Sequence, residues 1–299
     1  TRPVDFHLDA LEKLGAKIVL KNGYIEATAK KLIGCEINFP GVSVTGTENI
    51  MMAAVLAKGQ TVLRNVAKEP EVEDLANFLN AMGAKVNGAG TDEIIIDGVD
   101  DLKGTEFSIP ADRIEAGTYL IAAAITGGDV TISNVQAPRM NNILDKLKLS
   151  GASVIVSDDT IQLIMENDSI LPVDISTAPF PGFPTDMQAQ FTVLNALSKG
   201  SSVVTENVFE NRFMHVQELN RMGCDITVKG SNAFIKGVSS LNGAPVMATD
   251  LRASASLILA GLCANGETIV DRIYHIDRGY ERIEEKLSYL GANITRLPH

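Results

Sequence analysis

The sequence is poor in cysteine and has no cluster of basic residues. Its 299 residues include three cysteines at unpatterned positions, which argues against a disulfide framework and indicates reduced thiols in a cytosolic protein. We expect Cys35, Cys224 and Cys263 to be small buried hydrophobic residues. The net charge is −11 and no run of lysine or arginine is present, so neither nucleic acid nor an anionic membrane surface is an expected partner.

Several common motifs are also missing. No apolar run approaches the ~18 residues that span a membrane, and no signal peptide is recognisable. The sequence has no glycine-rich dinucleotide motif, no Walker loop and no His/Cys spacing typical of a metal site, so no metal, flavin or nicotinamide cofactor is expected. A chain of this length, with 45% hydrophobic residues, is long enough for two domains with substantial cores.

The chain repeats a pattern of helix, glycine and strand. Glycines that follow a predicted helix and directly precede a predicted strand recur at spacings of 68, 68, 72 and 68 residues, at Gly15, Gly83, Gly151, Gly223 and Gly291. A second series, also placed before strands, lies between them at Gly59, Gly128, Gly200 and Gly266. These positions are typical of helix C-caps. The period exceeds the ~20–50 residues of solenoid repeats, which predicts that each copy is a small α/β unit.

The repeat predicts the domain organisation. The copy that ends at Gly15 has only fourteen residues before its turn, so the chain is expected to begin inside a copy. If copies come in threes, residues 111–299 form a domain of three repeats. Residues 1–110 are then the remainder of a first domain, with two repeats of which the first is incomplete.

Ionisable residues gather at the predicted starts of helices, which are natural anion sites. Asp186 follows Pro184 and the predicted N-cap Thr185, and begins an apolar helix that needs no acid for its packing. It either complements the helix dipole or serves a substrate. Arginine is unfavourable at a helix N-terminus, so three arginines predicted there suggest clamps for an anionic ligand: Arg212, Arg252 and Arg278. The alternative is pairing with the neighbouring acids Glu210, Asp250 and Asp277.

Six stretches carry a resemblance to a known family: 2–5 (RPVD), 69–71 (EPE), 183–190 (FPTDMQAQ), 209–215 (FENRFMH), 247–254 (MATDLRAS) and 271–282 (DRIYHIDRGYER). Along the whole chain they closely resemble the bacterial UDP-N-acetylglucosamine 1-carboxyvinyltransferases. The resemblance implies an α/β fold built from α+β repeats, with two inside-out α/β barrel domains of the enolpyruvyl transferase type. It also implies a cytoplasmic enzyme that transfers the enolpyruvyl group of phosphoenolpyruvate to the 3-hydroxyl of UDP-N-acetylglucosamine, the first committed step of peptidoglycan synthesis.

The resemblance also implies roles for individual residues. Asp186 is expected to contact the sugar 3-hydroxyl as its base. Phosphoenolpyruvate is expected to be held by Arg212, Arg252 and Arg278, with Arg278 moving in on closure. Contacts to the sugar nucleotide are expected from Arg2, Pro3, Val4, Asp5, Phe6, Ser43, Val44 and Val208, with Arg2 also near the reacting phosphate. Asp250 is either a cap or the residue that orients an arginine; we favour the second and count Asp250 with the substrate-binding residues.

Two departures from the family pattern matter. The family's loop cysteine, phosphate-binding lysine and adjacent asparagine would all precede Thr1. We therefore expect this chain to be inactive alone, with that N-terminal segment cleaved, truncated or supplied as a separate partner chain. Gly41 stands where many relatives carry a lysine near the diphosphate.

Two alternatives stay open: a shikimate-type enolpyruvyl transferase and a non-catalytic nucleotide-binding fragment. For His215 and His275 we favour packing roles.

Overall fold

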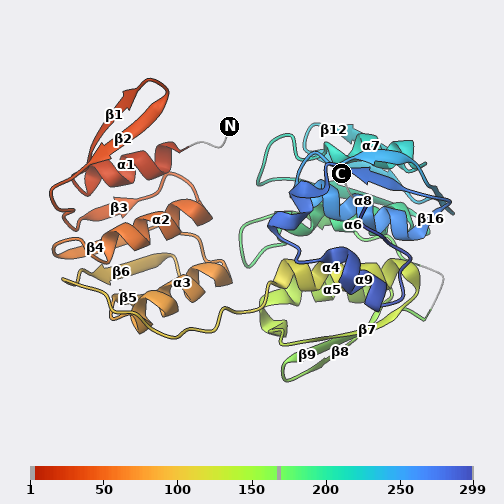
Figure 1. Cartoon of the computed structure of the whole chain (residues 1–299), viewed down its shortest axis with the longest axis horizontal. Helices are drawn as coiled ribbons and strands as arrows, with labels where there is room; N and C mark the ends of the chain where they lie inside the picture. The colour runs from red at the N-terminus through yellow and green to blue at the C-terminus, as the bar shows by residue number, and fades with distance from the viewer. Residues whose placement is uncertain (1–3, 167–169, 298–299) are drawn as a thin grey trace. The chain divides into compact units, whose positions relative to one another are not determined.

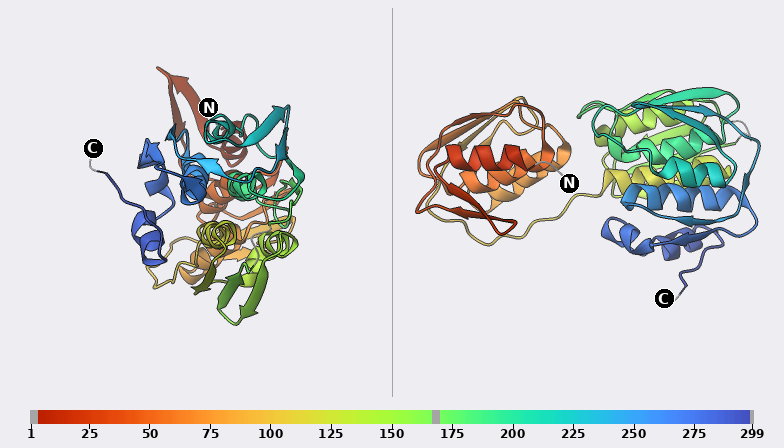
Figure 2. Two further views of the ribbon diagram at one scale, coloured as in Figure 1. Left: turned by 90° about the vertical axis from the view of Figure 1, so that its right-hand side faces the viewer. Right: turned by 90° about the horizontal axis from the view of Figure 1, so that it is seen from above.

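The chain forms two compact units. The computed structural model describes residues 4–166 and 170–297. Unit 1 comprises residues 1–110 together with 179–181, and unit 2 comprises residues 111–178 and 182–299. Figure 1 shows the elements of each unit, and Figure 2 gives two further views.

Unit 1 places helices beside a mixed sheet and a separate hairpin. Its elements, in chain order, are α1 (Asp5–Lys13), β1 (Lys17–Lys21), β2 (Tyr24–Thr28), β3 (Glu36–Asn38), α2 (Val44–Ala54), β4 (Gln60–Arg64), α3 (Pro70–Ala81), β5 (Lys85–Asn87) and β6 (Glu93–Asp97). The helices α1, α2 and α3 lie side by side (Figure 1). Their inner faces form one hydrophobic core with the strands, around the fully buried residues Leu14, Ile50 and Leu63.

Unit 2 has more helices and a larger core. Its elements, in chain order, are α4 (Arg113–Thr126), β7 (Asp129–Ser133), η1 (Ala137–Met140), α5 (Asn141–Leu149), β8 (Ser153–Ser157), β9 (Thr160–Ile164), β10 (Ile175–Ser176), η2 (Thr185–Met187), α6 (Gln188–Ala196), β11 (Ser201–Thr205), α7 (His215–Arg221), β12 (Asp225–Lys229), β13 (Asn232–Lys236), β14 (Leu241–Asn242), β15 (Pro245–Met247), α8 (Leu251–Cys263), β16 (Ala264–Asn265), β17 (Ile269–Asp271), η3 (Ile273–Arg278) and α9 (Ile283–Tyr289).

The two units contain sheets of the same topology. One sheet has the strand order β3-β4-β6-β5 and the other β10-β11-β13-β12. In each, the first two strands are parallel and the others pair antiparallel. The register also repeats, because Gln60 lies opposite Asp97 in one sheet and Ser201 lies opposite Lys236 in the other. The sequence repeat therefore corresponds to a repeated unit of strand, helix, strand, helix and hairpin.

Helices lie at the centre of unit 2, with the strands around them (Figure 2, right). All nine residues of α6 are buried, and α6 packs against both α4 and α8, which are also largely buried. Within the described residues the strands form separate sheets of two to four strands. The α/β inside-out arrangement implied by the resemblance is thus present as buried helices covered by small sheets.

The glycine turns form as predicted, with two differences. Gly15, Gly83, Gly151, Gly223 and Gly291 all have φ between +96° and +103°, a conformation that favours glycine after a helix. In the second series the left-handed residue that ends α4 is Gly127, with φ +67°, one position before the predicted Gly128. The strand predicted after Gly291 is absent, since residues 292–297 form none. Gly15, Gly83, Gly151 and Gly223 each precede the first strand of a hairpin.

Candidate substrate site

Asp186 lies in a single 3₁₀ turn, η2, that leads into the buried helix α6. Pro184 precedes this turn in an extended conformation. The prediction that Thr185 is a side-chain N-cap is wrong, because its hydroxyl donates to Glu206 Oε2 (2.8 Å) and accepts from Arg212 Nη1 (2.6 Å). The loop is therefore fixed by contacts to other segments, and the Asp186 carboxylate is left for the arginines beside it.

Two arginines share the Asp186 carboxylate. Arg212 Nη2 lies 2.6 Å from Oδ1, and Arg252 Nη2 lies 2.9 Å from Oδ2. Burial by itself would raise the pKa of Asp186, but the charges and hydrogen bonds of Arg252 and Arg212 hold it below its ordinary value. The carboxylate is ionised at neutral pH, and the two guanidiniums are held side by side around it.

The structure contradicts the alternative that Arg212 and Arg252 pair with their neighbouring acids, and it places only one of the three arginines at the start of an α-helix. Neither Arg212 nor Arg252 pairs with its neighbouring acid; both pair with Asp186 instead. Only Arg252 lies in the first turn of an α-helix, α8, whose N-cap is Asp250. The Asp250 carboxylate accepts the backbone N–H groups of Arg252 and Ala253 at 2.8 and 2.9 Å, so Asp250 is a helix cap.

A buried polar network supports Arg252. Its Nη1 donates to the Tyr280 hydroxyl at 3.4 Å, and that hydroxyl lies 2.8 Å from Thr118 Oγ1 on α4. Thr118 donates its own proton to the carbonyl of Ile114, so Tyr280 is the donor to Thr118. Gln190 of α6 donates to both hydroxyls at 3.1 and 3.4 Å. The network thus joins three central helices behind Arg252.

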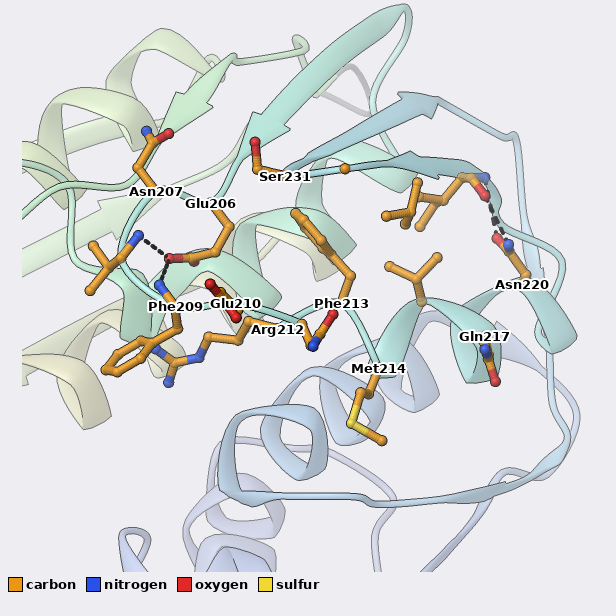
Figure 3. A pocket seen from close by; sticks show the side chains of 16 residues that line it. Glu206, Asn207, Phe209, Glu210, Arg212, Phe213, Met214, Gln217, Asn220 and Ser231 are labelled. Carbon is orange, nitrogen blue, oxygen red and sulfur yellow. Dashed lines mark hydrogen bonds between the residues drawn. The ribbon is translucent and has the colours of Figure 1, made fainter. Parts of the chain in front are cut away.

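Arg212 belongs to a loop between β11 and α7 that also carries Val208. Its guanidinium lies over the ring of Phe209, 4.9 Å from the ring centroid, a cation–π arrangement. The loop borders a hollow of about 810 Å³ that is also lined by α7 and by the β12–β13 hairpin (Figure 3). The N–H of Val208 donates to Glu206 Oε1 at 2.8 Å. A backbone contact from Val208 to a ligand therefore has to use its carbonyl oxygen.

Arg278 stands apart from this cluster. It is the last residue of η3 and is exposed, and within the described parts of the chain it makes no ion pair. Its neighbour Asp277 pairs with Arg296 at 2.7 Å. The structure thus brings Asp186, Arg212 and Arg252 together but does not add Arg278 to them.

The predicted sugar-nucleotide residues of unit 1 gather at the starts of α1 and α2. Ser43 is the N-cap of α2, and its Oγ accepts the N–H of Gly46 at 3.1 Å. Phe6 of α1 lies against Gly41, where an added Cβ would be 3.5 Å from the ring. Val4 and Asp5 lie at the exposed start of α1, and Val44 is the first residue of α2. Arg2 and Pro3 lie outside the described residues.

The cysteines and His215 are buried or half-buried. Cys224 is buried as predicted, whereas Cys35 and Cys263 are only half-buried. Burial raises the pKa of the Cys224 and Cys263 thiols to about 12. His215 is buried, and burial lowers its pKa to about 4, so its ring is neutral at pH 7.

In residues 4–166 and 170–297 no group of His, Cys, Asp and Glu side chains could hold a metal ion. None of the helices found there is long and apolar enough to cross a membrane.

Sequence reasoning missed several residues that hold this site in place. Glu206, Thr185 and Tyr280 each contact one of the arginines or a residue bonded to it. Residues 201–206 (SSVVTE) show no alternation of polar and apolar residues, so nothing in the sequence indicated that Glu206 is buried. In the structure, Ser202 and Val204 are the inward-facing residues of β11, and residue 206 lies on the same buried face. A glutamate at a buried strand position requires a set of hydrogen-bond donors.

The fold is that of the enolpyruvyl transferases. The family model of EPSP synthase (3-phosphoshikimate 1-carboxyvinyltransferase) matches residues 1–287, and the chain belongs to this family of enolpyruvyl transferases. A solved enolpyruvyl transferase, NikO from Streptomyces tendae, has a TM-score of 0.90 at 25% identity, over 98% of this chain and 72% of that one. EPSP synthase from Acinetobacter baumannii, at 22% identity and a TM-score of 0.76, shares the fold.

More similar relatives give the particular kind of transferase. The UDP-N-acetylglucosamine 1-carboxyvinyltransferase of Hydrogenovibrio crunogenus is 59% identical over 296 residues, which are 99% of this chain and 71% of the relative. The protein of the same name from Coxiella burnetii is also 59% identical, over 99% of this chain and 69% of its own length. The chain is thus similar to transferases named UDP-N-acetylglucosamine 1-carboxyvinyltransferase, and it spans 71% and 69% of the length of these two relatives.

Proposed function

We propose that the protein transfers the enolpyruvyl group of phosphoenolpyruvate to the 3-hydroxyl of UDP-N-acetylglucosamine and releases phosphate, a step of peptidoglycan synthesis. The observation that carries this proposal is the pair of guanidiniums held on one carboxylate, with Arg212 and Arg252 both on Asp186. The names of the relatives at 59% identity support the choice of acceptor.

The proposed reaction proceeds by addition and elimination. The sugar oxygen forms a bond to C2 of phosphoenolpyruvate, while the hydroxyl loses its proton and the methylene carbon gains one. The tetrahedral adduct then loses phosphate from C2 and a proton from the methyl group, which restores the double bond. In this scheme Asp186 accepts the hydroxyl proton. Arg212 and Arg252 hold the carboxylate and phosphate of the donor, and as fixed cations they stabilise these anionic groups without exchanging protons.

The arginines also affect how strong a base Asp186 is. In the free protein both guanidiniums stabilise the ionised carboxylate, which makes it a weak base. An anionic donor that takes up part of the hydrogen bonding of Arg212 and Arg252 raises the pKa of Asp186. In this proposal, donor binding thereby prepares the base for the sugar hydroxyl. Arg278 is exposed and makes no ion pair in the part of the chain that the structure describes, so it is available to move toward the donor.

The sugar nucleotide is assigned to two sets of residues. In unit 1, the backbone N–H groups of Ser43 and Val44 come before the first hydrogen bond of α2 and suit a diphosphate, with Phe6 and Asp5 on α1 also assigned to the sugar nucleotide. In unit 2, the carbonyl of Val208 and the carboxylate of Asp186 serve the sugar. The free thiols of Cys35, Cys224 and Cys263 support a cytoplasmic location for this chemistry.

Ligand-dependent thermal unfolding tests the proposal. A ligand that binds only the folded chain, at ~100 times its dissociation constant, adds ~2.7 kcal/mol to the free energy of unfolding. We expect UDP-N-acetylglucosamine to raise the melting temperature and shikimate 3-phosphate to leave it unchanged. A rise with shikimate 3-phosphate alone would instead indicate the shikimate-type reaction. No response to either ligand would reject binding of the sugar nucleotide by these 299 residues.

A further inference from the structure

A second carboxylate, Glu206, lies behind the Asp186 cluster. It directly follows β11 and is only 4% exposed. In the described part of unit 2 no lysine, arginine or histidine forms an ion pair with it. A buried carboxyl group without a cation is stable only where hydrogen-bond donors surround it.

Four donors converge on Glu206. Its Oε1 accepts hydrogen bonds from the N–H of Val208 (2.8 Å), the N–H of Phe209 (3.0 Å) and the hydroxyl of Thr177 (2.9 Å). Its Oε2 accepts the hydroxyl of Thr185 at 2.8 Å. In Figure 3, the two hydrogen bonds from backbone N–H groups are the dashed lines that meet at one oxygen of the Glu206 carboxyl group. Both oxygens are acceptors, which is the pattern of an ionised carboxylate.

The two threonines extend this arrangement to the rest of the loop. A hydroxyl has one proton, so a threonine that donates to Glu206 can only accept from its other neighbour. Thr185 accepts from Arg212 Nη1 at 2.6 Å, and Thr177 accepts from the N–H of Asn207 at 2.9 Å. Hydrogen bonds therefore run in one direction, from the loop 207–212 through the threonines to Glu206.

We propose that Glu206 is a positioning residue for the transferase site: one oxygen fixes the Val208–Phe209 backbone, and the other fixes Arg212 against Asp186 through Thr185. This inference rests on the proposed function for the roles of Val208 and Arg212. The oxygens serve different parts of the site, since Oε1 accepts the N–H groups of Val208 and Phe209 and Oε2 accepts from Thr185, which in turn accepts from Arg212. The Phe209 ring under Arg212 is held by the same backbone contact.

Glu206→Gln tests the proposal with little change of volume. The amide oxygen that remains is neutral and a weaker acceptor than a carboxylate oxygen, which weakens the bonds from Val208 and Phe209, and the amide nitrogen cannot accept from Thr185, so that bond is lost. We expect the Val208 and Phe209 amide protons to exchange with solvent at least about tenfold faster, and UDP-N-acetylglucosamine to bind at least about tenfold more weakly by calorimetry. Glu267→Gln is the matched control, because Glu267 is an exposed glutamate of unit 2 away from this loop.

Thr185→Val separates the two oxygens and serves if Glu206→Gln does not fold. Valine keeps the shape of threonine but cannot connect Arg212 to Glu206. We expect the Val208 and Phe209 amides to stay protected. The Asp186 carboxyl carbon, followed by ¹³C NMR, should titrate at a higher pH because Arg212 is less firmly held.

The outcomes distinguish this inference from the proposed function. Unchanged amide exchange in a folded Glu206→Gln variant, or an unchanged Asp186 titration in Thr185→Val, overturns the positioning role. A lower melting temperature with unchanged exchange and affinity also overturns it, since it indicates a merely structural residue. If the unsubstituted chain fails to bind UDP-N-acetylglucosamine, the proposed function fails, and the ligand-free measurements still decide the role of Glu206.

Discussion

Arg252 and Asp186 form an ion pair between two helices: Arg252 Nη2 lies 2.9 Å from Asp186 Oδ2. Arg252 is in the first turn of α8, and Asp186 is in the 3₁₀ turn that precedes α6. A cation in the first turn of a helix is unfavourable beside the helix dipole. The Asp186 carboxylate and the Tyr280 hydroxyl offset this cost in the free protein. The arginine is thereby fixed before any anionic ligand arrives, which is the arrangement that electrostatic stabilisation of a reacting group requires.

Asp186→Asn should separate binding from turnover. Asparagine keeps the shape of the side chain but cannot accept the sugar hydroxyl proton, so we expect affinity for UDP-N-acetylglucosamine within about threefold of the unsubstituted chain and phosphate release reduced at least about 100-fold. Turnover is measured in a chimaera that adds the part of the Hydrogenovibrio crunogenus relative that this chain does not cover. Retained phosphate release in that chimaera would exclude Asp186 as the base.

Residues 1–299 by themselves should show no turnover, because they correspond to only 71% and 69% of the length of the two relatives. The same chimaera is the positive control for this measurement. Phosphate release by the isolated chain, at a rate comparable to the chimaera, would show that these 299 residues contain every group the reaction needs.

Much of the fold could be predicted from the sequence because a glycine recurs at the end of a helix in each repeat. A backbone position with φ near +100° after a helix strongly favours glycine. Gly83 and Gly223 therefore mark the ends of helices. The strand predicted after Gly291 failed because a strand also needs a partner, and pairing is not visible in a local pattern. The position of Gly127 differed from the prediction by one residue, since two adjacent glycines can each end a helix.

The candidate site was predictable only in part. Motifs identified Asp186, Arg212 and Arg252, and helix-start reasoning suggested that the arginines clamp an anionic ligand, with pairing to neighbouring acids as the alternative. The actual partner of both is Asp186, 26 and 66 residues away in the sequence. The loop between β11 and α7 brings Arg212 to it, and the packing of α6 against α8 brings Arg252. Glu206 was missed because its role depends on backbone N–H groups and hydroxyls, whose directions the sequence does not reveal.

Arg278→Ala should weaken donor use without destabilising the fold. The Arg278 side chain is exposed and makes no ion pair in the described chain, so we expect the free energy of unfolding to change by less than about 0.5 kcal/mol. In the chimaera, the KM for phosphoenolpyruvate should rise by about tenfold or more, as expected for loss of a charged hydrogen bond. Arg221→Ala, at an exposed arginine on α7, is the matched control and should leave this KM unchanged. An unchanged KM for Arg278→Ala would remove Arg278 from the donor site.

The cysteines should be slow to react in the folded chain. Burial raises the pKa of Cys224 and Cys263 to about 12, so at pH 8 only a very small fraction of either thiol is the reactive thiolate. Ellman's reagent should label these two cysteines only after unfolding in urea, when all three react. Cys35→Ser makes the assay specific to this pair. Rapid labelling of folded Cys35→Ser protein would contradict the burial of both thiols.

The buried ring of His215 should make the protein lose stability in weak acid. Burial lowers the pKa of His215 to about 4, with Arg212 lowering it further and Asp250 opposing the shift. In the unfolded chain the His215 side chain has a pKa of ~6.5. Below that pH the unfolded state therefore binds a proton at His215 that the folded state does not bind. Stability is therefore full above ~6.5 and is lost as the pH falls toward the folded pKa.

His215→Met measures this contribution because methionine is similar in size and does not titrate. The Nε2 atom of His215 is buried without a hydrogen-bond partner in the described chain, so its removal leaves no donor or acceptor unpaired there. Between pH 7.5 and 5.0, we expect the unsubstituted chain to lose about 2 kcal/mol more unfolding free energy in urea than the variant. His275→Met, at a partly exposed histidine, should keep the acid sensitivity. If His215→Met loses stability in parallel with the unsubstituted chain, the buried ring does not carry the effect, and the acid sensitivity has to come from groups that both proteins share.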